Sequence, residues 1–311
     1  MIVDPLPVAW TFDAIGTGWR IDTDEPIPDA ARAAVTDRIE RFDRDWSRFR
    51  EDSLVTRIAR AAGRYRLPSD APPLLALYRE LYRASGGRVS PLVGRALEAL
   101  GYDAEYRLTP SATPARVPDW DDAVAWDGEF LDTATPVVLD VGAAGKGYLV
   151  DLVSALLAEH GIPRHVVDAS GDLVSSGVPL RVALEHPADP RKAIGVVDLG
   201  GADLGSDLGS DLSPDLGPDL SRVALCASAP NRRAWGDGLH HVLDAVTGLP
   251  TSEVVASWAI ADSAMIADGA ATALFFDTDP DFYRIHDVIT IRMFANGRVE
   301  HSPAFSGELF L

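Results

Sequence analysis

The stretch that most constrains this fold runs from residue 136 to residue 161. It begins with PVVLDV, a short β-branched apolar run that is typical of a buried strand. A turn of small residues, GAAGKG, follows, and YLVDLVSALLAEHG then places apolar residues at helical spacing up to a stop signal at Gly161 and Pro163. These residues predict a strand, a glycine-rich turn and a helix. Free N–H groups and the positive end of the helix would make the turn an anion site, to which Lys146 adds a positive charge.

Neither common nucleotide-binding fingerprint fits this turn. A P-loop would need glycine and then Ser or Thr at the positions that hold Asp140 and Gly147. The dinucleotide pattern G-x-G-x-x-G is also absent from the turn. A carboxylate at the start of a phosphate-binding turn is expected only where a metal ion or a ribose hydroxyl lies nearby.

Composition narrows the range of partners. The 311 residues carry a formal net charge of −19, which argues against nucleic acid or an anionic membrane as the main partner. An anionic substrate would therefore need a local cation, such as a metal ion. Cys226 is the only cysteine, so a disulfide framework and a cysteine-rich metal site are excluded. The N-terminus does not resemble a signal peptide and no apolar run reaches membrane-spanning length, so we expect a soluble cytoplasmic protein.

Helical patterns concentrate before residue 101, and strand patterns with crossover helices follow. The clearest helix spans residues 30–49, where Val35, Ile39 and Phe42 begin a single apolar stripe. This segregation indicates the α+β class, a single domain with mixed or antiparallel sheets and flanking helices. The other expected elements are strands around Gly16 and Gly18, a helix opened by Pro72 and Pro73, a helix ending near Leu100, and strands at 165–177, 180–184, 194–199 and 254–261.

A low-complexity acidic segment occupies about residues 202–221. Calcium loops space their acidic residues by two or follow a nine-residue glycine pattern, whereas here aspartate recurs at every fourth position. We therefore predict a disordered surface insertion that can be deleted with little loss of activity. The recurring residues are Asp203, Asp207, Asp211, Asp215 and Asp219.

A second pair of polar residues lies near the C-terminal end of the chain. Ser263 is expected to cap a helix that runs through Phe276. Asp268 and Thr272 are four residues apart on that helix and are therefore neighbours on one face. A carboxylate and a hydroxyl in this arrangement can cap backbone groups or face solvent, and they are also suitable oxygen ligands for magnesium. The residues alone leave these alternatives open.

Several motifs in one order resemble the ApbE-type FAD:protein FMN transferases, or flavin transferases. LDVGAAGKGYLVD is similar to the family's LDLGxxAKGYxxD, HVLDAVTGLP to HIIDPxTGxP, and ADGAATAL to ADALSTAL. The resemblance extends from Ile15 to Phe275, which is most of the chain. It implies that residues 1–311 form one flavin transferase domain, into which the acidic segment is inserted.

The resemblance also implies roles for particular residues. Magnesium would bind the carbonyl oxygen of Ala143 together with Asp268 and Thr272. His241 corresponds to a histidine implicated in phosphoryl transfer, and the neighbouring His240 is the alternative on the residues alone. Contacts with FAD are implied at Ile15, Phe49, Arg88, Val89, Ser90, Asp140, Lys146 and Val242.

The chain also departs from the family pattern. Arg-Val-Ser stands at 88–90 in place of the usual Ala-Phe-Asp, and Ala-Ser-Ala at 227–229 in place of Thr-Ser-Gly. Ser170 replaces a glycine and Ala245 replaces a proline. These positions bear on flavin or adenine contacts, whereas the metal and phosphate residues are all present.

The function implied by the resemblance is magnesium-dependent transfer of FMN from FAD to a Ser or Thr hydroxyl of an acceptor protein, with release of AMP. Two alternatives stay open: hydrolysis of FAD to FMN and AMP by the same site, and passive flavin binding. The acceptor motif of the family, Asp-x-x-Ser/Thr-Gly-Ala-Thr, does not occur in the chain, so transfer would require a separate acceptor protein. No nucleic acid or membrane partner is expected.

Overall fold

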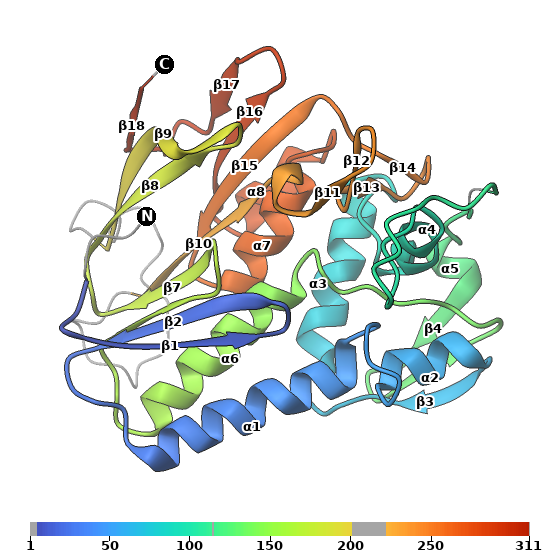
Figure 1. The fold of residues 1–311 in the computed structure, drawn as a ribbon, viewed down its shortest axis with the longest axis horizontal. Coiled ribbons are helices and arrows are strands. Elements are labelled where there is room, and N and C mark those ends of the chain that lie inside the picture. Colours follow the sequence, from blue (N-terminus) through green and yellow to red (C-terminus); the bar gives the residue numbers. More distant parts are fainter. Residues whose placement is uncertain (1–4, 114, 201–221, 311) are drawn as a thin grey trace.

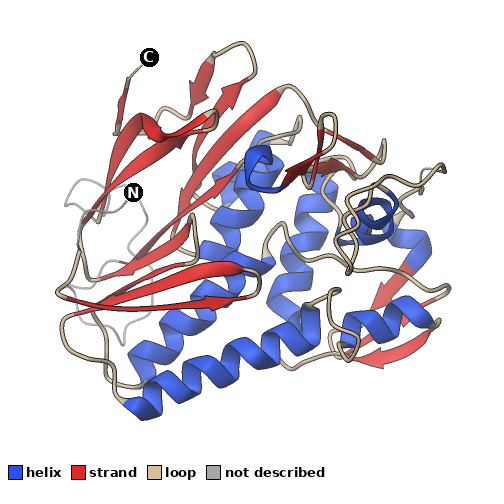
Figure 2. Ribbon diagram, viewed as in Figure 1, coloured by secondary structure: helices blue, strands red, loops and turns tan. Residues whose placement is uncertain are grey.

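An antiparallel sheet of eight strands forms the centre of the computed structural model, which describes residues 5–113, 115–200 and 222–310 (Figures 1 and 2). The strand order is β1-β2-β6-β7-β10-β15-β16-β17, and every neighbouring pair is antiparallel. Two three-stranded sheets, β18-β9-β8 and β3-β5-β4, and two short ribbons, β11-β12 and β13-β14, complete the described strands. The α+β prediction is thus confirmed.

The described elements have the following bounds. The helices are α1 (Asp29–Trp46), α2 (Leu54–Arg60), α3 (Ala71–Ala84), η1 (Pro91–Val93), α4 (Gly94–Ala99), α5 (Trp120–Ala123), α6 (Gly145–Glu159), η2 (Pro230–Arg233), α7 (Ala264–Ala273) and α8 (Pro280–Ile285). The strands of the central sheet are β1 (Val8–Ala14), β2 (Thr17–Thr23), β6 (His165–Asp168), β7 (Asp172–Ser176), β10 (Arg222–Ser228), β15 (Val254–Ala261), β16 (Ile289–Phe294) and β17 (Val299–His301). The other strands are β3 (Gly63–Arg66), β4 (Val124–Trp126), β5 (Phe130–Thr133), β8 (Leu180–His186), β9 (Asp189–Leu199), β11 (Ala234–Trp235), β12 (Leu239–His240), β13 (Leu243–Asp244), β14 (Leu249–Pro250) and β18 (Glu308–Leu309).

Both faces of the central sheet are covered. Because side chains alternate along a strand, Ala259 and Ala261 face a core shared with the helices, while Trp258 and Ile260 face the other side. That second core is closed by apolar residues of β8 and β9. Helices α1, α3, α6 and α7 cover one face, and the small sheet of β8, β9 and β18 covers the other (Figure 2).

Helix α7 lies in the middle of the helical layer, which explains its run of small residues. It contacts α3, α6, β10 and β15, and most of its residues are buried, so small side chains allow these neighbours to approach closely. A Cβ atom on Gly147 would lie 2.1 Å from the carbonyl oxygen of Ala264. Gly147, the second glycine of GKG, is therefore required by the close approach of α6 to α7.

Most of the elements expected from periodicity are present. The hairpin of β1 and β2, the long helix α1 and the paired strands β6 and β7 lie where the patterns predict them, and Ser263 caps α7 by accepting the N–H of Ile266. Two helices end three residues earlier than predicted: α1 ends at Trp46 rather than at residue 49, and α7 ends at Ala273 rather than at Phe276.

The strand predicted for PVVLDV is wrong. Residues 136–141 have no regular secondary structure and join no sheet of the described structure, and the N–H of Asp140 donates instead to the carbonyl of Pro91 (2.8 Å). The segment packs so closely on α4 that a Cβ on Gly94 would lie 2.6 Å from Val138. A buried apolar run has the same sequence pattern whether it pairs in a sheet or packs against a helix, so the pattern could not separate the two.

Two further expectations concern the chain as a whole. The predicted acidic insertion at about residues 202–221 falls within residues 201–221, which lie outside the described residues, so it stays a prediction. Among the residues that are described, no helix is both long and apolar enough to cross a membrane.

Candidate active site

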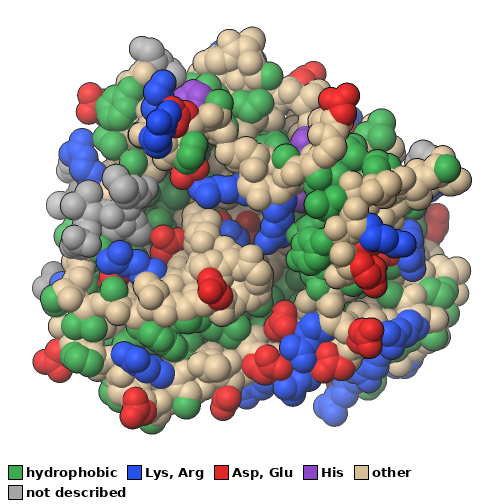
Figure 3. All heavy atoms as spheres, in the orientation of Figure 1, with side chains coloured by type: hydrophobic (Ala, Val, Ile, Leu, Met, Phe, Trp, Pro, Cys, Tyr) green, Lys and Arg blue, Asp and Glu red, His purple; other side chains and the backbone are tan. Residues whose placement is uncertain are grey.

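A cavity of about 920 Å³ opens beside the turn that follows residue 141. Figure 3 shows it as a hollow near the middle of this face, with basic side chains around the opening. Residues from distant parts of the chain line this cavity. They include every site residue implied by the resemblance except Arg88. Those lining it are Ile15, Phe49, Val89, Ser90, Asp140, Ala143, Lys146, His241, Val242, Asp268 and Thr272.

Asp140 organises the glycine-rich turn. Its Oδ1 accepts the N–H of Gly142 (2.8 Å), and its Oδ2 accepts Nε of Arg48 (2.6 Å). Burial raises the pKa of the Asp140 carboxyl, but the charge and hydrogen bond of Arg48 outweigh it, so the pKa lies below its ordinary value. Arg48, itself buried, is not identifiable from the sequence, since nothing local distinguishes it from the other arginines at the end of α1.

Lys146 is not the free positive charge that the sequence suggested. Its Nζ lies 2.9 Å from Oδ2 of Asp172 and donates to the carbonyl of Ala169 (3.2 Å). Asp172, in the DASGDL stretch, is fully buried. Although burial lowers the pKa of Lys146, Asp172 and Asp268 raise it above its ordinary value. The ammonium is thus charged and already neutralised by a carboxylate.

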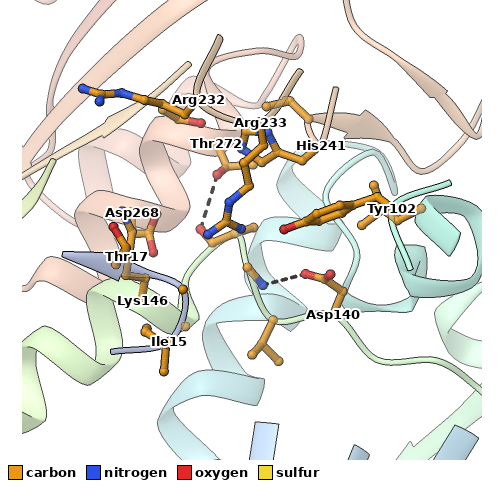
Figure 4. A pocket seen from close by; sticks show the side chains of 18 of the residues that line it. Ile15, Thr17, Tyr102, Asp140, Lys146, Arg232, Arg233, His241, Asp268 and Thr272 are labelled. Atoms are coloured by element: carbon orange, nitrogen blue, oxygen red, sulfur yellow. Dashed lines mark hydrogen bonds between the residues drawn. The ribbon is translucent and has the colours of Figure 1, made fainter. Parts of the chain in front are cut away.

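Asp268 and Thr272 lie on one side of the cavity (Figure 4), and Ala143, which also lines it, is bonded to Thr272. Asp268 Oδ2 accepts the N–H of Gly147 (2.9 Å), and the Thr272 hydroxyl donates to the carbonyl of Ala143 (3.4 Å). Burial, with Asp172 nearby, holds the pKa of Asp268 well above its ordinary range. The carboxylate, hydroxyl and carbonyl oxygens are all hard ligands, so the set fits magnesium with only one carboxylate. No cluster of three or more His, Cys, Asp or Glu residues suited to a metal occurs in the described part of the chain.

The two adjacent histidines, the last residue of β12 and the residue after it, have different surroundings. His240 points away from the cavity: its Nε2 donates to the carbonyl of Thr251 (2.8 Å), and its Nδ1 accepts the N–H of Val242 (3.3 Å). His241 lines the cavity, and its buried Nδ1 has no hydrogen-bond partner among the described residues. Burial and the charge of Arg233 lower the pKa of His241 to about 4. His241 is therefore neutral near pH 7 and has a ring nitrogen available.

Aromatic rings form one wall of the cavity. Tyr106 stacks on Phe49 (centroids 5.3 Å apart), Tyr102 meets Phe49 edge-on, and Trp235 stacks on Tyr102 (5.5 Å). Arg48 lies over the rings of both Phe49 and Tyr102, at 4.3 and 4.8 Å from their centroids. The sequence identified only Phe49, because Tyr102 and Tyr106 come from a loop and Trp235 from a two-residue strand, which is too short to show a periodic pattern. Such a wall suits a planar heteroaromatic ring.

Three of the departures from the family pattern, at residues 88, 170 and 245, have local explanations. Arg88 points out of the cavity and pairs with Asp244, and its carbonyl accepts the N–H of Ala245 (3.0 Å). A proline at 245 would lack this donor, so the departures at 88 and 245 are in contact with each other. Ser170 adopts a left-handed conformation (φ 56°), which a glycine would adopt without strain, and its hydroxyl donates to the carbonyl of Gly18 (2.8 Å).

A family model described as the ApbE family matches residues 15–286. The chain belongs to the ApbE family. This confirms the resemblance drawn from the sequence motifs, and with it an enzyme of the ApbE type.

Named relatives of this ApbE-family chain are distant in sequence. A FAD:protein FMN transferase of Klebsiella pneumoniae is 27% identical, with 87% of this chain and 79% of the relative aligned. One of Rhodobacter capsulatus is also 27% identical; 94% of this chain is aligned with it, but only 56% of that longer protein is covered.

Solved structures share the ApbE fold. The ApbE protein of Thermotoga maritima superimposes with a TM-score of 0.76 at 21% identity, covering 95% of this chain and 97% of that one. The flavin transferase ApbE of Vibrio cholerae gives a TM-score of 0.75 at 20% identity, covering 96% and 97%. At these identities the likeness shows the common fold.

Proposed function

We propose that this chain is a magnesium-dependent FAD:protein FMN transferase that moves FMN from FAD to a Ser or Thr hydroxyl of a separate acceptor protein and releases AMP. The observation that carries the proposal is one cavity in which a phosphate-type turn, an oxygen donor set and a neutral histidine with an unpartnered Nδ1 lie together beside an aromatic wall. The relatives named FAD:protein FMN transferase support the same reaction. A cytoplasmic location stays a prediction from the sequence.

The reaction replaces one P–O bond by another. The acceptor hydroxyl oxygen bonds to the FMN phosphorus, the bond from that phosphorus to the bridging oxygen breaks, and the electron pair leaves with AMP. His241 is neutral and offers Nδ1, so it can take the proton of the attacking hydroxyl. Asp140 and Arg48 hold the turn, and the aromatic wall orients the flavin or adenine ring. Magnesium held by Ala143, Asp268 and Thr272 would supply charge neutralisation on the phosphates.

The test is incubation with FAD, magnesium and an acceptor fragment carrying the family motif, with AMP release and acceptor mass measured together. AMP release with an FMN adduct on the acceptor is the expected result. Equal AMP and free FMN without an adduct would indicate hydrolysis, and FAD binding without AMP would indicate passive flavin binding.

Two variants separate metal binding from proton transfer. Asp268→Ala or chelation of divalent metal should lower turnover by about a hundredfold or more, because the phosphate charge loses its counter-ion. His241→Ala should keep FAD affinity and lower only the transfer step. Asp281→Ala, an exposed carboxylate paired with Arg284 on α8, is the matched control and should behave as wild type. Turnover that survives Asp268→Ala would overturn the metal assignment.

A further inference from the structure

Among the described residues, every cation that lines the cavity has an ion-pair partner except one. Arg48 is paired with Asp140 and Arg50 with Asp52. Lys146 is paired with Asp172 (2.9 Å) and Arg232 with Glu185 (2.9 Å). Arg233 is the remaining lining cation, and no ion pair or side-chain hydrogen bond is found for it among the described residues. Within the described part of the chain, the cavity therefore presents one uncompensated guanidinium to a ligand.

The ribbon of β11 and β12 directs Arg233 toward the cavity. Ala234 pairs with His240 and Trp235 with Leu239, so continuing this antiparallel register places Arg233 opposite His241. Trp235 fixes the ribbon, because its indole N–H donates to the carbonyl of Leu100 (2.9 Å) and its ring stacks on Tyr102.

Figure 4 shows the Arg233 side chain reaching from η2 toward the turn that carries Asp140. The positive charge of Arg233 contributes to the lowered pKa of both Asp140 and His241, which agrees with this placement. Its guanidinium thus lies between His241 and the glycine-rich turn, which is the anion site expected from the sequence.

We propose that Arg233 binds the pyrophosphate of the dinucleotide directly and is the residue that distinguishes a phosphorylated flavin from a bare one. This inference rests on the proposed function for the identity of the ligand. A guanidinium forms two parallel hydrogen bonds to a phosphate and stays charged at any working pH. It is also needed here, because a chain of net charge −19 repels an anion at long range.

The neighbouring Arg232 cannot take this role in the same way. Its guanidinium is held by Glu185, and the adjacent Asn231 is tied to the β8–β9 hairpin through a bond from Nδ2 to the carbonyl of Pro187 (2.6 Å). Using Arg232 for a phosphate would break an existing ion pair, whereas using Arg233 breaks none.

The experiment compares FAD with riboflavin, which lacks phosphate, as ligands of the full chain in the presence of a chelator. Affinities are measured by flavin fluorescence. Arg233→Ala should weaken FAD binding about tenfold or more and leave riboflavin binding unchanged, since a charge-assisted phosphate contact is lost. Arg233→Lys should recover part of the loss. Arg284→Ala, which removes an exposed arginine of α8 paired with Asp281, is the control and should bind both ligands as wild type does.

The outcomes separate this inference from the proposed function. FAD affinity that is unchanged in Arg233→Ala, an equal loss for FAD and riboflavin, or a wild type without preference for FAD over riboflavin would each overturn the role of Arg233. A wild type that binds FAD through Arg233 but forms neither AMP nor an acceptor adduct would instead refute the proposed function and leave the Arg233 assignment standing.

Discussion

At the scale of single residues, the pair formed by Lys146 and Asp172 contributes to both the site and the fold. Asp172 is inaccessible to solvent, and the Lys146 side chain retains 24% exposure. A buried carboxylate is tolerated only while its partner remains, because an unpaired charge in the interior has lost its hydration.

We therefore expect Lys146→Met to lower the free energy of unfolding by about 3 kcal/mol, the usual cost of breaking a buried pair. Lys146→Met combined with Asp172→Asn should recover most of that loss, because the remaining group carries no charge. Urea unfolding at pH 7 measures both. Strictly additive losses in the double variant would show that the two residues are not energetically coupled.

His165 connects stability to pH. It is the first residue of β6 and is fully buried against α6, where Nδ1 donates to the carbonyl of Ile162 (2.7 Å) and Nε2 accepts the hydroxyl of Ser154 (2.8 Å). Both ring nitrogens are thus engaged by the neutral form. Burial lowers the pKa of His165 from 6.5 to about 4.

Between pH 6.5 and 4 the unfolded chain binds a proton at this histidine and the folded chain does not. Stability should therefore fall as the pH is lowered through this window, with His165 contributing about 3 kcal/mol. The slope of unfolding free energy against pH should become shallower in His165→Gln. It should be unaltered in His301→Gln, which changes an exposed histidine of β17. Equal slopes in all three proteins would refute the assignment.

At the scale of elements, one aspartate of α6 fixes the start of α7. Asp151 accepts the N–H groups of Ala264 (2.8 Å) and Met265 (2.9 Å), accepts the hydroxyl of Ser263 (2.7 Å), and pairs with Arg222. A carboxylate at a helix N-terminus satisfies otherwise free donors and complements the helix dipole. The Asp of KGYLVD is therefore a positioning residue for the helix that carries Asp268.

Asp151→Ala should destabilise the protein by about 2 kcal/mol and speed amide hydrogen exchange in the first turn of α7. Because α7 presents Asp268 and Thr272, turnover of FAD should fall as well. Asp279→Ala removes the side-chain cap of the peripheral helix α8, an acceptor for the N–H of Asp281 (3.0 Å), and serves as the control. It should leave exchange in α7 and FAD turnover as in wild type; a similar effect of both variants would contradict the positioning role.

At the scale of the whole molecule, the central sheet is shared by two apolar cores. Adjacent residues of β7, such as Leu173 and Val174, belong to different cores, as do Val166 and Val167 of β6. Neither core can lose its packing without exposing one face of the same strands. The two layers should consequently unfold together.

Leu184→Ala tests this coupling. Leu184 of β8 is fully buried in the core distant from the helices, so the substitution should cost about 2–5 kcal/mol. Urea unfolding followed by circular dichroism and by tryptophan fluorescence should still give one coincident transition, shifted to lower urea. Leu249→Ala, at a side chain that is 54% exposed, should shift it little. A separate early transition of the β8–β9 layer would contradict the shared-core interpretation.

Local patterns in the sequence determined most elements and many of the residues that line the cavity. Helical and alternating periodicity depend only on neighbours along the chain, which is why α1, α6 and the β6–β7 pair were predictable. The short glycine-rich turn and the Asp268–Thr272 spacing likewise express local geometry. The order of the motifs along the chain was by itself enough to indicate the ApbE family.

Only the tertiary structure decided how charges are distributed in the site. The hydrogen bond from Arg48 to Asp140 joins residues 92 positions apart, and the ion pair of Lys146 and Asp172 joins helix α6 to strand β7. Which cation remains available to a ligand depends on these distant partners. Local patterns therefore could not identify Arg233, and they could not show that Lys146 is already paired with a carboxylate. The same holds for residues 136–141, whose apolar side chains are buried as expected. Whether they joined a sheet depended on which element packed beside them.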